Sequence, residues 1–200
     1  MSLRAIAREL RIHAPFTALG TLTGIVIMSL LVQMRVPRQI SVDLFWILHP
    51  LHVVLSAVVT VAMYRLHTKG SIWKTILIGY LGSVGIASLS DCIIPYLGEC
   101  ILNLPHRGLH LGALEKWWVV NPLAGLGIAI GLWNPATKLP HAGHVFLSTW
   151  ASLFHISMAL GTQLEAAVLV LIAVFLFLAV WIPCCTSDIV FPLLFAKDSP

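Results

Sequence analysis

The stretch LSDCIIPYL (89–97) recurs near the end of the chain as TSDIVFPLL (186–194). Both copies place a Ser-Asp pair inside a hydrophobic run, with a proline four residues after the aspartate. An ionised side chain within the hydrocarbon of a bilayer costs several kcal/mol unless it is paired or solvated. We therefore expect Asp91 and Asp188 to face the protein interior rather than lipid.

The rest of the chain has the composition of a membrane protein. Its 200 residues are 58% hydrophobic and 10% charged, whereas soluble domains contain about 25% charged residues, and the mean hydropathy is +0.93. No charged block or Gly/Ser-rich linker divides the chain, so we predict a single transmembrane domain over residues 1–200. The net charge of +4 comes from scattered basic residues, which favours a lipid bilayer rather than nucleic acid as the partner.

Six apolar segments approach the roughly 20 residues that a spanning helix needs. They are 14–34, 44–64, 75–97, 118–134, 142–163 and 166–195. The last is too long for one straight span and contains Pro183 and Pro192, so we expect a broken helix there. The first segment lacks a clear small-residue cleavage site and is interpreted as a retained span. These segments predict an all-α polytopic membrane fold.

Basic residues give the orientation. With six alternating spans, eight of the Lys and Arg residues fall on the side of the N-terminus and four on the opposite side. Since cytoplasmic loops carry the excess of positive charge, we predict a multi-pass protein of the plasma (inner) membrane with both termini in the cytoplasm. The linker 98–117 mixes apolar and charged residues, so we expect an amphipathic interfacial helix on the outer side.

Two further segments recur in the same order as the Ser-Asp motif. HPLHVVLS (49–56) matches HAGHVFLS (141–148), and PFTALGTLTG (15–24) resembles PLAGLGIAIG (122–131). These matches predict an internal duplication, with one repeat over 14–97 and the other over 118–195. Each repeat holds three spans, so the second copy is inverted in the membrane. Inverted repeats are common in secondary transporters, whose binding sites lie near the bilayer midplane.

Paired histidines and aspartates are the candidate metal ligands. Within each pair the histidines are three residues apart, so they share a helix face. Alternating spans place the first pair with its aspartate toward the outer face and the second pair with its aspartate toward the inner face. Whether the two half-sites meet is left open. Imidazole with carboxylate suits Zn, Fe, Mn, Co or Ni, and a proton relay or structural hydrogen bonding is the alternative. The predicted ligands are His49, His52, Asp91, His141, His144 and Asp188.

Supporting residues surround the two motifs. A proline has no N–H and pushes away the carbonyl four residues earlier, so each motif frees a backbone oxygen beside its carboxylate and its serine hydroxyl. Thiolates would shift the metal preference toward Zn or Cu(I). The supporting residues are Ser90, Pro95, Ser187, Pro192, Cys92, Cys184, Cys185 and His155. His106 and His110 are candidates for an outer mouth, although an exposed polar face explains them equally simply.

These features favour a membrane transporter for a divalent transition-metal cation, with the two aspartates exchanging protons for the cation. One alternative is an integral-membrane metalloenzyme acting on a lipid or quinone. Another is an accessory subunit that binds a partner protein or haem. The sequence contains no glycine-rich phosphate loop, nucleophile elbow or H-E-x-x-H motif. It leaves the metal, the coupling ion and the formation of a homodimer open.

Overall fold

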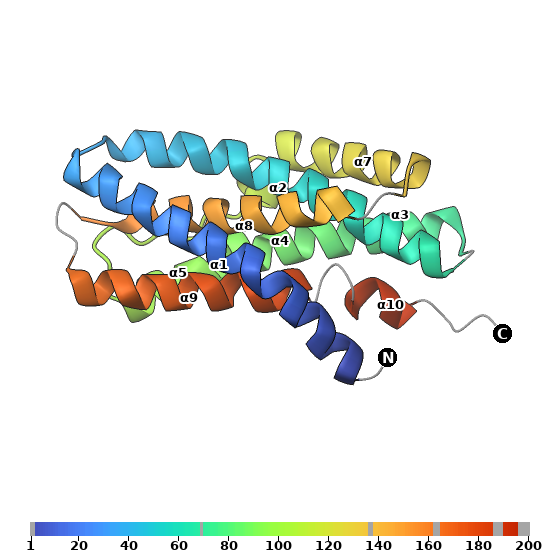
Figure 1. The fold of residues 1–200 in the computed structure, drawn as a ribbon. Helices are drawn as coiled ribbons and strands as arrows, with labels where there is room; N and C mark the ends of the chain where they lie inside the picture. The colour runs from blue at the N-terminus through green and yellow to red at the C-terminus, as the bar shows by residue number, and fades with distance from the viewer. Residues whose placement is uncertain (1–2, 69, 136–137, 162–164, 186–189, 196–200) are drawn as a thin grey trace.

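The computed structural model is an elongated bundle of long helices (Figure 1). It describes residues 3–68, 70–135, 138–161, 165–185 and 190–195, and within these ranges it contains helices and connecting turns but no strand. The helices are α1 (Leu3–Gln33), α2 (Arg38–His67), α3 (Ile72–Tyr80), η1 (Leu81–Gly85), α4 (Ile86–Ser88), η2 (Leu89–Ile93), α5 (Ile94–Ile101), α6 (Gly112–Glu115), α7 (Trp117–Trp133), α8 (Lys138–Ala159), α9 (Ala166–Cys185) and α10 (Phe191–Phe195).

Four helices within the described ranges are long and apolar enough to cross a membrane. They are Ala14–Gln33, Arg38–His67, Ile72–Ile101 and Ala166–Cys184, and α7 is a shorter apolar helix. Large apolar side chains remain exposed on the bundle surface, as lipid contact requires; Leu22, Trp73 and Val170 are examples. The all-helical class is therefore confirmed and the four apolar helices indicate a membrane protein, while the six spans and the inverted repeats remain predictions.

Helix α8 forms the centre of the bundle. It contacts α1, α2, η2, α5 and α9, and residues 151–156 are all buried. Because this segment of α8 is surrounded by protein, its Ser and His side chains contact other helices rather than lipid. Helix α9, in contrast, exposes more than half of Val170, Leu171 and Val174. The polar groups are thus gathered inside an apolar shell.

Glycines allow α7 to pack closely on α2. A Cβ added at Gly127 would lie 2.5 Å from the carbonyl oxygen of Val54, and one added at Gly131 would lie 2.9 Å from that of Val58. Small residues four apart are the usual device by which membrane helices approach each other. This close contact fixes the position of α2, which carries the first histidine pair.

Replacing Gly127 with alanine is expected to destabilise the protein by about 1–3 kcal/mol, the usual cost of overpacking. Gly125→Ala is the matched control, because a Cβ there would meet no described atom within 4 Å. Thermal unfolding in detergent should show a lower midpoint for Gly127→Ala than for Gly125→Ala. Equal midpoints would contradict the α2–α7 packing.

The third long helix is irregular where the Ser-Asp motif lies. It runs from Ile72 to Ile101 but includes two π-helical segments, η1 and η2, and η2 contains Asp91. At its end the Ile94 N–H bonds to the Leu89 carbonyl, five residues back. The helix continues through Pro95. Single π turns are common at functional sites, and this one re-aims the side chains of the motif.

The linker between the predicted repeats differs from expectation. An amphipathic helix over 98–117 was predicted, but residues 102–111 form turns and irregular backbone, and only the short helix α6 follows. The prediction was wrong because Pro105 and Gly108 interrupt the helical pattern and the Glu99 side chain binds the Gly108 N–H. In the described part of the last predicted span, 166–195, lie the helices α9 and α10, with Pro192 in α10.

Candidate metal centre

Asp91 is the centre of a buried hydrogen-bond network. Its Oδ2 lies 2.9 Å from Nδ1 of His49 and 2.6 Å from Nδ1 of His52. Its Oδ1 accepts hydrogen bonds of 2.8 Å from the hydroxyls of Ser90 and Ser148. All five side chains are buried. These four contacts compensate a carboxylate that would otherwise be costly in the bundle interior.

The side chains of the network come from three helical segments. His49 and His52 lie on one face of α2, Asp91 comes from the π turn η2, and Ser148 comes from α8. Ser152, one turn further along α8, donates to the Ser90 carbonyl at 3.0 Å. The π turn therefore presents both its carboxylate and a backbone oxygen to neighbouring helices.

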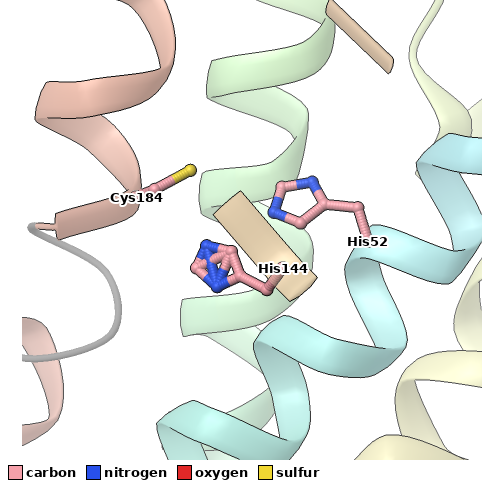
Figure 2. A group of neighbouring side chains, drawn as sticks. All are labelled: His52, His144 and Cys184. Atoms are coloured by element: carbon pink, nitrogen blue, oxygen red, sulfur yellow. The ribbon is translucent and has the colours of Figure 1, made fainter. Parts of the chain in front are cut away.

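Beside this network lies a group that can hold a metal ion. One ligand atom from each of His52, His144 and Cys184 lies within 4.8 Å of the other two, and the ring centres of the histidines are 5.0 Å apart. Figure 2 shows the three side chains converging from α2, α8 and α9. Each is no more than 1% exposed. We call this group the central site.

Asp91 prepares His52 for metal binding. A carboxylate can only accept hydrogen bonds, so the His52 Nδ1 carries the hydrogen and Nε2 is the nitrogen able to bind a metal. Metal-binding histidines commonly donate their second N–H to a carboxylate, which fixes the tautomer and raises the basicity of the ring. Asp91 was predicted as a ligand. In the structure it orients two imidazoles and is not part of the central site.

The donor set favours particular metals. Imidazole nitrogens suit Zn, Cu, Fe and Ni, while a thiolate selects Zn or Cu(I). The His52–His144–Cys184 group combines both donor types. Zinc is the divalent ion that satisfies both preferences, at usual bond lengths of about 2.0–2.1 Å to nitrogen and about 2.3 Å to sulfur.

The structure brings some predicted residues together and separates others. One histidine of each predicted half-site, His52 and His144, lies next to the other, with ring centres 5.0 Å apart. Cys92 instead packs in an apolar cluster with Phe45, Phe154 and Met158. The remaining predicted residues lie outside the central site, namely Pro95 and Pro192 within helices, and His106, His110 and His155 near the loop after α5. The side chains of His141 and Cys185, and residues Ser187 and Asp188, lie outside the described residues.

Sequence reasoning missed the importance of two residues. Ser148 is not among the site residues predicted from the sequence, yet it donates to Asp91 and accepts from the Cys184 thiol at 3.4 Å. Glu99 was placed in the interfacial linker, yet it is buried and bonds to His155 at 2.7 Å. The signal for Ser148 was its position one turn after His144 in the repeated segment. Glu99 follows Asp91 by about two helical turns, which places both acids on one face.

The assignment of a metal-binding group rests on this geometry. The donors come from separate helices, they are buried, and one of them is held by a carboxylate. No family model, curated protein or solved structure matches this chain.

Proposed function

We propose that the protein is a membrane transporter for a divalent transition-metal cation, with zinc as the favoured substrate. The observation that carries this proposal is the buried His52–His144–Cys184 group, whose members come from both predicted repeats. In the proposed architecture, two inverted three-helix repeats contribute the equivalent helices α2 and α8. A site between inverted repeats is where alternating-access transporters bind their substrates.

The position of the central site supports transport. His52 lies halfway along α2 (Arg38–His67), so a spanning α2 would hold the site near the bilayer midplane. The π segments η1 and η2 interrupt the neighbouring helix beside the site. Transporters commonly place irregular helix segments at the substrate, because such segments change conformation more readily than regular helix.

The number of donors supports an exchangeable ion. Structural zinc sites are closed by four protein ligands, whereas sites that exchange or activate a ligand keep a position open. Among the described residues the central site offers three ligand atoms. A bound ion with an open position can accept water or another ligand on its way in or out.

Transport can be measured in proteoliposomes that contain a zinc-sensitive dye. Protein purified without a His tag is expected to give saturable zinc uptake above that of empty liposomes. His67→Ala is a matched control on α2, because His67 is exposed and, among the described residues, its Nδ1 bonds to the Met63 carbonyl of its own helix. If Zn, Mn, Fe, Co and Ni all cross no faster than in empty liposomes, the transport proposal is wrong.

A second candidate function is an integral-membrane metalloenzyme acting on a lipid or quinone. The meeting of His52 and His144 in one place favours it, since an enzyme needs its ligands at a single depth and an open position for water. The same preparation distinguishes the two functions. Stoichiometric bound metal with no flux would favour the enzyme, while flux that depends on His144 would favour the transporter.

A further inference from the structure

A second pair of imidazoles lies beyond the central site, where α5 and α8 meet the loop before α6. The ring centres of His110 and His155 are 5.6 Å apart, with an angle of 61° between the ring planes. His155 is fully buried in α8. The side chain of His110 is 30% exposed. The pair therefore connects the bundle interior with its surface.

Each of these imidazoles is held through Nδ1 by a glutamate. His155 Nδ1 lies 2.7 Å from Glu99 Oε1, and His110 Nδ1 lies 3.3 Å from Glu115 Oε2. The second oxygens of the glutamates accept backbone N–H groups of Gly108 and Leu111. The carboxylates thus hold both rings in the tautomer that leaves Nε2 able to bind a metal, as Asp91 does for His52.

The unused nitrogen of His155 indicates a ligand. Its Nε2 is buried and has no hydrogen-bond partner among the described residues. A buried polar atom without a partner costs about 1–3 kcal/mol. The ring spacing also suits a shared ion, because a zinc ion bonded to two imidazoles holds their centres roughly 5–6 Å apart.

We propose that His110 and His155 form a second binding site for the same class of divalent transition-metal cation, at the mouth of the path to the central site. This inference rests on the proposed function. His110 contacts solvent and captures the ion, and His155 accepts it on the buried side. With two nitrogen donors, this second site binds zinc more weakly than the central site, which has nitrogen and sulfur donors. A site that passes its ion onward must bind it more weakly than the site that receives it.

We call the His110–His155 pair the outer site. Phe45 lies between this site and the Asp91 network. Its ring stacks on His49 with centres 5.4 Å apart and lies nearly perpendicular to the His155 ring with centres 5.2 Å apart. His49 also has a buried Nε2 without a partner among the described residues. The Phe45 ring thus contacts both the His155 ring and the His49 ring. We infer that Phe45 keeps the two sites distinct.

The alternative is that Glu99 and His155 only fasten the loop that contains Gly108. Substitution by asparagine separates the two explanations. The Asn amide N–H takes the place of the imidazole Nδ1–H and keeps the bond to glutamate, but no atom replaces Nε2. His155→Asn thus retains the loop contact and removes the metal-binding nitrogen. His110→Asn does the same at the more exposed position, where a folding defect is not expected.

The experiment counts zinc ions per chain by equilibrium dialysis of detergent-purified, untagged protein. Wild type is expected to bind two ions of unequal affinity. His155→Asn and His110→Asn should each lose the weaker ion, or bind it at least about 10-fold less tightly, and His144→Ala should lose the tighter one. His106 is the other histidine that the sequence suggested for this mouth, but its side chain is exposed and no described contact joins it to the His110–His155 pair. His106→Ala should therefore keep both ions.

Two results would overturn the outer site: wild-type stoichiometry and affinity in both asparagine variants, or loss of the weaker ion in His106→Ala as well. The proposed function fails separately, when proteoliposomes show no flux although the wild-type protein binds two ions. If the outer site feeds transport, His110→Asn should raise the KM for zinc severalfold while kcat stays near the wild-type value.

Discussion

His144→Ala is expected to lower the zinc affinity of the central site by more than about 100-fold. Changing an outer partner of a metal ligand typically costs 10–100-fold in affinity, and His144 is a candidate ligand itself. It lies in the buried group with His52 and Cys184. Competition with a chromophoric chelator measures the affinity directly.

A conservative variant tests whether the loss of zinc affinity comes from a lost ligand rather than from misfolding. Cys184→Ser keeps the size of the side chain and a hydroxyl that can bond to Ser148, as the thiol does, but a serine hydroxyl is a poor ligand for zinc. Its affinity should fall to a similar degree while its thermal midpoint stays near that of wild type. Wild-type affinity in both variants would show that zinc does not bind in this group.

Features encoded by local patterns could be predicted from the sequence. The low charge content predicted the membrane class, and spacing of three residues placed His49 and His52 on one face of α2. The repeated segment singled out His144 as the counterpart of His52. Charge content, residue spacing and repeated segments can all be read along the chain without knowledge of which helices pack together, so a single sequence suffices for these conclusions.

Features that depend on the packing of distant helices could not be predicted. Ser148 bonds to Asp91 across 57 positions of sequence, and His155 bonds to Glu99 across 56. A serine or glutamate has the same local pattern whether it packs against a neighbour or completes a buried network. The π turn at Asp91 is similar, since the motif shows a proline but not how the helix accommodates it.

In the linker 98–117, a local pattern predicted a helix that the structure does not form. Its mixture of apolar and charged residues resembles an interfacial helix, but the Glu99 side chain binds the Gly108 N–H and the His106 N–H bonds to the Ala159 carbonyl. Both bonds join the loop to other parts of the bundle. Tertiary contacts, rather than local propensity, therefore determine the backbone of this segment.

Asp91→Ala is expected to reduce the free energy of unfolding by about 2–6 kcal/mol. The substitution removes the acceptor shared by the buried Nδ1–H groups of His49 and His52, and each buried donor left without a partner costs about 1–3 kcal/mol. The Ser90 hydroxyl contributes little to the loss, because the Ala87 carbonyl lies 3.4 Å away as a second acceptor. Unfolding by denaturant in detergent micelles measures the change.

Asp91→Asn separates the charge of this residue from its shape. The amide oxygen can still accept from both imidazoles, and the amide N–H groups can donate to hydroxyls that rotate to accept them, so most of the stability should be retained. Zinc affinity should nevertheless fall about 10–100-fold, because His52 loses the carboxylate that raises its basicity. Retained affinity in Asp91→Asn would assign Asp91 a purely structural role. Wild-type stability in Asp91→Ala would instead mean that the network does not form. The expected pair of results, a large stability loss in one variant and a selective affinity loss in the other, arises only if Asp91 both completes the fold and prepares the metal ligand.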